Sequence, residues 1–182
     1  LRDAANDYIT AQKVNKVGFD SVAQKTSDYS ATVAKIKAAG ANVVIYTGYY
    51  PDGGALAKAL NDSGWKGQFI GGDGVLNSAY IDVAGKAAAE GTKFTAPAVP
   101  FEVVANAAQQ AAFTKATGLK SAAGHVYVTE AYNATNVFLS CISKGNTTRA
   151  AIQKCVTNGS FLTIDGKTTI KFTFAGEVVG GA

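Results

Sequence analysis

Hydrophobic and polar positions change period along the chain, and the change is clearest around one stretch. Asn42 to Tyr46 is an uncharged run of β-branched and aromatic residues, which is typical of a strand buried on both faces of a sheet. Gly48 interrupts this run, and Pro51 suits the first turn of a helix because its missing N–H is not needed there. From Ala55 the apolar positions follow a helical spacing. The stretch therefore predicts a strand, an aromatic loop and a helix.

The same alternation of strand and helix patterns runs through the first half of the chain. Asp28 is placed to cap a helix, and Gly40 is placed to end it in a left-handed conformation. Alternating elements with short loops predict an α/β fold, in which a Rossmann-like parallel sheet has right-handed crossovers and flanking helices. Strands are also expected at 17–22, 68–70 and 92–95, and helices at 1–11, 29–39, 55–62 and 78–84.

The composition changes most sharply at the two prolines of residues 97–100. We interpret this segment as a crossover that ends an α/β domain at 1–96. Helical spacing fills 101–160, and an alternating pattern predicts a terminal β segment at 161–182. The expected helices are 103–116, 126–143 and 147–156, and the expected edge strand is 168–174.

Charge and hydropathy exclude two classes of partner. The net charge is +4, but the lysines are scattered, and no basic cluster is interleaved with aromatic residues as in a nucleic-acid interface. No apolar run reaches the length of a membrane span.

The two cysteines, Cys141 and Cys155, are too far apart for a redox C-x-x-C pair, and no further cysteine or clustered histidine offers zinc ligands. Their position predicts one disulfide between neighbouring helices and an oxidising, exported setting. Two free buried thiols remain the alternative.

Two loops carry candidate binding groups. Tyr49 and Tyr50 follow the first strong strand, and Asp73 stands among three glycines at the end of the next one. Ligands of open parallel sheets bind outside the carboxyl ends of the strands. A carboxylate there can accept strong hydrogen bonds from an ammonium group. Ordinary structural roles remain open for both residue types, because tyrosine is common at strand ends and Asp-Gly is common in turns.

The sequence offers little for catalysis. His125 is the only histidine, and no nucleophile elbow, phosphate-binding loop or acidic metal cluster occurs. Gly71 to Asn77 lacks the third glycine of a dinucleotide fingerprint. We therefore expect no cofactor and no metal. An α/β enzyme that uses Asp73 as a base is a remote alternative, and it would need a partner group that the sequence does not show.

Several short motifs resemble those of one family in their order and spacing. The motifs are Asp28-Tyr29-Ser30, Gly48-Tyr49-Tyr50-Pro51, Gly71-Gly72-Asp73-Gly74-Val75, Ala89-Glu90-Gly91, Glu130-Ala131-Tyr132-Asn133-Ala134, Thr169-Ile170-Lys171-Phe172 and Gly176-Glu177-Val178. Taken together they resemble the type I periplasmic binding proteins, and within these the Leu/Ile/Val-binding branch that serves ABC importers.

The resemblance implies an extracytoplasmic solute-binding protein with two α/β lobes joined by a hinge. The lobes would close around a branched-chain amino acid, and the protein would catalyse no reaction. Tyr49 would bound the pocket, Asp73 would pair with the ligand ammonium, and Tyr50 would be a neighbouring wall. The implied partner is the permease of an ABC transporter, and the implied location is periplasmic or extracellular, with or without a lipid anchor. An amide- or urea-binding protein, or a ligand sensor on the same fold, is the alternative.

The sequence departs from the family in two respects. Thr173 to Gly176 stands where the family has Asp-x-Asn-Gly, so this turn is expected to change. The first lobe and the opening strand of the second lobe would precede Leu1, and the helices at 103–156 would pack on that first lobe. We therefore expect the chain to be part of a larger protein or to pair with a companion chain that carries the missing lobe.

Overall fold

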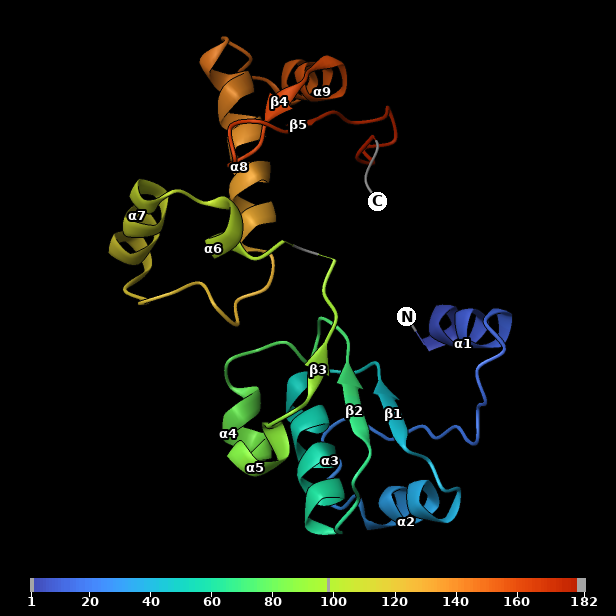
Figure 1. Ribbon diagram of the computed structural model, residues 1–182. Coiled ribbons are helices and arrows are strands. Elements are labelled where there is room, and N and C mark those ends of the chain that lie inside the picture. The colour runs from blue at the N-terminus through green and yellow to red at the C-terminus, as the bar shows by residue number, and fades with distance from the viewer. Residues whose placement is uncertain (1, 98, 180–182) are drawn as a thin grey trace. The chain divides into compact units, whose positions relative to one another are not determined.

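The computed structural model of the protein describes residues 2–97 and 99–179 (Figure 1). The chain divides into two compact units, Leu1–Pro97 and Ala98–Ala182, which we call unit 1 and unit 2. No helix in the described ranges is long and apolar enough to cross a membrane.

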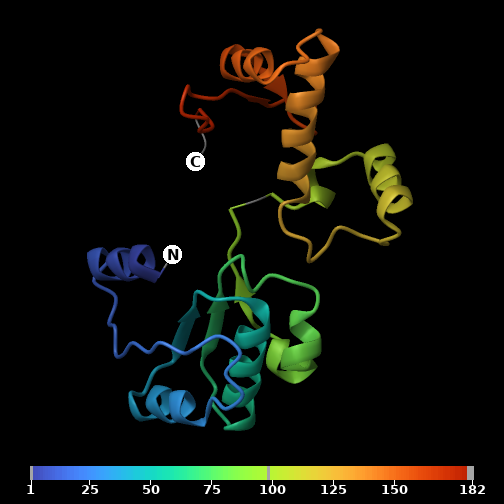
Figure 2. The same cartoon turned by 180° about the vertical axis from the view of Figure 1, so that it is seen from behind.

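Unit 1 contains a parallel sheet with strand order β1-β2-β3. The carboxyl ends of the three strands lie at the same edge of the sheet (Figures 1 and 2). In its register Ile45 of β1 pairs with Ile70 of β2, which pairs in turn with Lys93 of β3. The strands are β1 (Val43–Tyr46), β2 (Gln68–Gly71) and β3 (Lys93–Phe94). The helices are α1 (Arg2–Ala11), α2 (Ser30–Ala38), α3 (Tyr50–Asp62), α4 (Tyr80–Ala84) and α5 (Lys86–Ala89).

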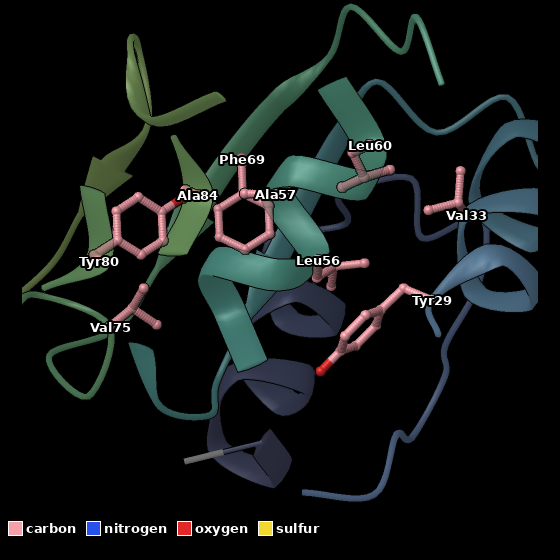
Figure 3. Close-up of a cluster of buried hydrophobic side chains, with 9 residues drawn as sticks. All are labelled: Tyr29, Val33, Leu56, Ala57, Leu60, Phe69, Val75, Tyr80 and Ala84. Carbon is pink, nitrogen blue, oxygen red and sulfur yellow. The ribbon is translucent and has the colours of Figure 1, made fainter. Parts of the chain in front are cut away.

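The core of unit 1 lies between α3 and one face of the sheet (Figure 3). Leu56 and Leu60 of α3 are almost completely buried and pack in one cluster with Phe69 of β2. Burying each such side chain contributes about 1.5–3 kcal/mol. The remaining members come from the α2 side, the loop after β2, α3 and α4: Tyr29, Val33, Val75, Ala57, Tyr80 and Ala84.

The prediction that β1 is buried on both faces is wrong. Val44 and Tyr46 pack against the core, but Val43 is 47% exposed and Ile45 is 49% exposed on the opposite face. Helix α1 buries none of its residues, so it does not cover that face. A run of β-branched residues indicates that a strand is suited to burial. It does not show whether other elements are present to cover both faces of that strand.

The strand predicted at Val17 to Val22 is also absent from the described structure. This segment is extended without a ladder partner, and Val17 and Phe19 are exposed. The outer edge of β1 has no strand beside it in the described sheet. Because a strand exists only through its pairing, sequence pattern alone cannot form one here.

The ends of α2 follow the predicted chemistry with a shift of one residue. Asp28 accepts a hydrogen bond from the Ser30 N–H at 2.8 Å, but Tyr29 occupies the N-cap position. Gly40 has φ +64° directly after Ala39, as expected for a residue that ends a helix.

Unit 2 consists of helices and a small antiparallel pair of strands. The helix predicted at 103–116 is divided, because Asn106 and Gln109 form a reciprocal capping box that starts a new helix. The helices are α6 (Phe101–Val104), α7 (Ala107–Thr117), α8 (Val128–Ser143) and α9 (Arg149–Asn158). The strands are β4 (Phe161–Leu162) and β5 (Thr169–Ile170).

Residues Thr173 to Gly176 form a turn. The Thr173 hydroxyl accepts the Glu177 N–H at 3.1 Å, and Gly176 takes a φ of +88°. Phe172 and Val178 form an isolated antiparallel bridge across it. A threonine hydroxyl is a usual side-chain acceptor in such turns. The difference from the family's turn stays a prediction.

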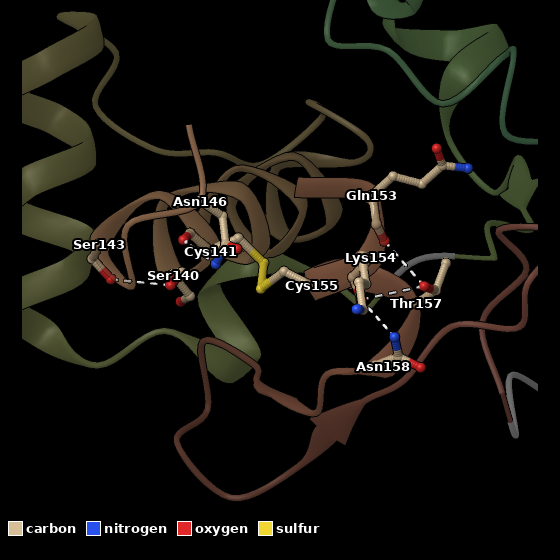
Figure 4. The surroundings of a disulfide bond; sticks show 9 residues. All are labelled: Ser140, Cys141, Ser143, Asn146, Gln153, Lys154, Cys155, Thr157 and Asn158. Atoms are coloured by element: carbon tan, nitrogen blue, oxygen red, sulfur yellow. Dashed lines mark hydrogen bonds between the residues drawn. A yellow bond between two sulfur atoms is a disulfide. The ribbon is translucent and has the colours of Figure 1, made fainter. Parts of the chain in front are cut away.

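The predicted disulfide is present and links α8 to α9 (Figure 4). Cys141 is fully buried against Val137 and Phe161, so the bond is part of a small apolar cluster. The two bonded cysteines are separated by 14 positions, a loop whose closure contributes about 3 kcal/mol in the chain-entropy model.

Replacing both cysteines by alanine should lower the stability of unit 2 by about 3 kcal/mol, because the unfolded chain regains the freedom of the closed loop. Urea unfolding followed by the helical circular dichroism signal would measure this. The single tryptophan, Trp65, lies in unit 1, and its fluorescence transition serves as the internal control that should not move. An unchanged helical transition would contradict the assigned contribution.

Candidate functional site

The candidate site lies where β1 and β2 end. The loop of residues 47–49 follows β1 and leads directly into α3, whose N-cap is Tyr49. The loop of residues 72–74 follows β2 and forms a turn closed by the Val75 N–H, which donates to the Gly72 carbonyl at 3.0 Å. Because β1 and β2 are parallel neighbours, the two loops stand side by side at the carboxyl edge.

Backbone hydrogen bonds fasten the loop of residues 72–74 to the two residues that flank the loop of residues 47–49. The Tyr50 N–H donates to the Gly74 carbonyl at 2.9 Å, and the Gly72 N–H donates to the Tyr46 carbonyl at 3.2 Å. A Cβ atom added at Gly74 would lie 2.7 Å from the Gly48 carbonyl oxygen and 3.2 Å from the Tyr49 ring. Only glycine therefore fits at position 74, and the Tyr49 ring lies against the residue that follows Asp73.

The structure brings the three sequence-predicted binding residues to one edge. Tyr49 is 63% exposed, while Tyr50 and Asp73 are half-buried. The phenol of Tyr49 and the carboxylate of Asp73 belong to adjoining loops, which is the arrangement expected of one wall of a binding site. This wall carries an aromatic surface and an anionic acceptor, a combination that suits a small cationic or zwitterionic ligand.

A buried carboxylate lies close to this edge, in the first turn of α3. The sequence analysis did not single it out. Asp52 lies in the first turn of α3 and is only 8% exposed. It accepts the Lys25 N–H at 2.7 Å and the Tyr29 hydroxyl at 3.0 Å. Burial raises the pKa of the Tyr29 hydroxyl, and the hydrogen bond to Asp52 and the charge of Asp52 raise it further, so this phenol stays protonated as a donor.

The signal that could have identified Asp52 is its position. An acidic residue in the first helical turn after a proline is favoured by the helix dipole and by free N–H groups, and such a residue is usually exposed. Its burial follows from its hydrogen bond with Tyr29, a residue that the sequence placed in a helix and in a family motif without a polar partner. The result is that the loop before α2 is tied to the start of α3.

A separate groove of about 720 Å³ runs between α2 and α3 and does not include the candidate residues. Its lining includes the apolar residues Tyr29, Val33 and Ala59, together with Lys37 and Lys58. Lys58 forms an ion pair with Asp62, and Lys37 donates to the Ser63 carbonyl. Both ammonium groups therefore already have an acceptor within the chain.

Within the described residues, no group of three or more histidine, cysteine, aspartate or glutamate side chains is arranged to hold a metal ion. The candidate wall thus consists of phenols, one carboxylate and backbone groups.

The chain belongs to the periplasmic binding protein family, whose model matches residues 1–176. It is 33% identical over 161 residues to Leu/Ile/Val-binding protein homolog 3 of Brucella melitensis, an alignment that covers 87% of this chain and 42% of that protein. It is 37% identical over 95 residues to the Leu/Ile/Val-binding protein BraC3 of Rhizobium johnstonii, covering 52% of this chain and 26% of that protein.

Solved structures show the same fold. The leucine-binding protein LivK of Thermotoga maritima matches with a TM-score of 0.74 and 21% identity over 96% of this chain and 50% of that chain. LivJ of Streptococcus pneumoniae, solved with isoleucine, matches with a TM-score of 0.73 and 18% identity over 96% of this chain and 55% of that chain. The α/β fold is therefore that of type I periplasmic binding proteins, and the chain spans about half the length of these relatives.

Gly74→Ala should destabilise unit 1 by about 1–3 kcal/mol, because the new methyl group would force the two loops apart. Urea unfolding followed by Trp65 fluorescence measures the change. Gly18→Ala is the matched control: a Cβ atom there meets nothing within 4 Å, so its effect should stay within about 0.5 kcal/mol. Equal stability of the two variants would show that the loops are not held as described.

Proposed function

We propose that the chain is the larger part of one lobe, with additional helices, of an extracytoplasmic solute-binding protein that delivers a branched-chain amino acid to an ABC importer. Tyr49 forms a wall of the ligand pocket, Asp73 accepts the ligand ammonium, and Tyr50 extends the aromatic wall. The protein binds by closing two lobes about a hinge and carries out no chemistry. The permease of the importer is its macromolecular partner.

One observation carries the proposal: the Tyr49 ring lies against Gly74, which places a phenol and the carboxylate of the preceding residue on adjoining loops. The carboxyl edge of a parallel sheet is where ligands of such folds bind. Membership of the family and the names of the relatives, which are Leu/Ile/Val-binding proteins, support an amino acid as the ligand. The family also supports a location outside the cytoplasm, where the protein acts either free or through a lipid anchor.

The proposal includes a second lobe, in the same polypeptide or in a companion chain. A single wall cannot enclose a ligand, and small-molecule sites normally bury 70–90% of the ligand surface. Two apolar surfaces of the described chain support the proposal. One is the face of β1 with Val43 and Ile45, and the other is a stripe along α8 whose members are 40–54% exposed. The stripe consists of Tyr132, Phe138, Leu139 and Ile142.

Asp73→Ala in the full-length protein should weaken leucine binding roughly thirtyfold or more, because truncating one partner of a buried charge pair costs 2 kcal/mol or more. Isothermal titration calorimetry with leucine measures the loss. 4-Methylpentanoate, which is leucine without its ammonium group, should bind the parent and the variant equally. The parent should therefore discriminate between these two ligands, and Asp73→Ala should not.

Asp82→Ala is the matched control, because Asp82 is an exposed aspartate on α4 of the same unit. It should leave leucine affinity unchanged. If Asp73→Ala also retains full affinity, Asp73 is not part of the site. If a short amide displaces leucine and binds more tightly, the protein is an amide receptor on this fold and the amino-acid assignment is wrong.

Purified native material should contain more polypeptide than the chain itself. Intact-mass and native mass spectrometry should find either a longer chain or a tightly bound companion. A single species near 18.7 kDa that binds leucine with no partner would contradict the two-lobe arrangement.

A further inference from the structure

Tyr46, the last residue of β1, touches both loops of the candidate site. Its carbonyl accepts the Gly72 N–H at 3.2 Å, so its backbone supports the loop that carries Asp73. Its ring stacks on Phe69 of β2, with centroids 6.0 Å apart, and lies on the face of the sheet that packs against α3. Tyr46 thus stands beneath the point where the two loops meet.

The chain turns closely around the Tyr46 ring. A Cβ atom added at Gly48 would collide with the Tyr46 hydroxyl oxygen, and one added at Gly53 would lie 3.0 Å from a ring carbon. Glycine in the first turn of a helix such as α3 lowers helix stability, so its presence at position 53 is explained by this close approach. The loop before Tyr49 and the first turn of α3 therefore both pack closely against the side chain of Tyr46.

The hydroxyl of Tyr46 faces two groups of the site region. Burial raises its pKa, and the charge of Asp52 raises it further, whereas the backbone N–H of Tyr49 acts in the opposite direction. The hydroxyl therefore remains protonated. Its oxygen is the atom that a side chain at position 48 would meet first, so removing it would free space beside the Gly48 backbone while leaving the ring stacked on Phe69.

We propose that Tyr46 is a positioning residue for ligand binding. Its hydroxyl and ring fix the backbone conformation of the loop that carries Tyr49 and Tyr50 next to Asp73. This inference rests on the proposed function, in which Tyr49 and Asp73 contact the ligand. Tyr46 itself stays beneath the site and acts through the loop. Gly48 and Gly53 are part of this arrangement, because a side chain at either position would displace the Tyr46 ring.

The test compares Tyr46→Phe with Tyr80→Phe in the full-length protein, using leucine as the ligand in calorimetry. Tyr80 is a matched control, since it is a buried phenol of the same core whose hydroxyl lies 3.2 Å from the Thr92 hydroxyl, away from both loops. Tyr46→Phe should weaken leucine binding roughly three- to tenfold, because the loop would lose the oxygen atom around which it turns at Gly48. Tyr80→Phe should bind leucine as the parent does.

A second substitution tests the contact directly. Gly48→Ala should weaken leucine binding in the parent and in the Tyr46→Phe background alike, because a Cβ atom at position 48 would lie 2.6 Å from a ring carbon that phenylalanine keeps. Parent-like affinity of Gly48→Ala would overturn the proposed contact. Parent-like affinity of Tyr46→Phe, or an equal loss in Tyr80→Phe, would overturn the positioning role.

Amide hydrogen exchange without ligand separates this inference from the proposed function. Exchange in the segment 47–53 should be faster in Tyr46→Phe than in the parent, and unchanged in Tyr80→Phe. If Asp73→Ala keeps full leucine affinity while this exchange difference is seen, the ligand assignment fails and the loop support stands. If Asp73→Ala loses affinity and the exchange does not change, the ligand assignment stands and the role of Tyr46 is wrong.

Discussion

The candidate site depends on two backbone hydrogen bonds. They join the loop after β2 to the residues that flank the loop after β1. The bonds from Tyr50 to Gly74 and from Gly72 to Tyr46 allow the two loops one relative position. Side chains of exposed loops normally lose conformational freedom when they bind a ligand, and this loss weakens affinity. A backbone already fixed by its own hydrogen bonds reduces that cost. The phenol and the carboxylate are therefore presented on a preformed wall.

Two polar side chains, one buried and one half-buried, lie next to the start of α3. Buried Asp52 holds the segment before α2 through the Lys25 N–H and the Tyr29 hydroxyl. Half-buried Tyr46 lies close to both Gly48 and Gly53. Buried polar groups are costly unless their hydrogen bonds are satisfied, and a satisfied network rigidifies its surroundings. No buried side-chain nitrogen or oxygen among the described residues lacks a hydrogen-bond partner. The start of α3 is thus held by contacts made within unit 1.

The alternation of strands and helices in unit 1 was predictable because periodicity and turn residues are local signals. Gly40, Gly48 and the Asp73 turn are of this kind, and so was the placement of the candidate residues at strand ends. The exposed face of β1 and the unpaired segment 17–22 were not predictable, because both depend on what lies beside them. The division of the helix at Asn106 shows a third limit: a capping box can start a new helix inside a segment whose apolar spacing is continuous.

Helix α8 is apolar on two opposite sides. One side of the helix buries Val137 and Cys141, and the other exposes a stripe that includes Phe138 and Leu139. A helix that is apolar on opposite sides is typical of an element packed between two layers. The disulfide to α9 fixes the helix on its buried side and leaves the stripe available for a second layer. The exposed stripe of α8 and the exposed face of β1 therefore have the same physical explanation: each is an apolar surface whose covering element lies outside the described contacts.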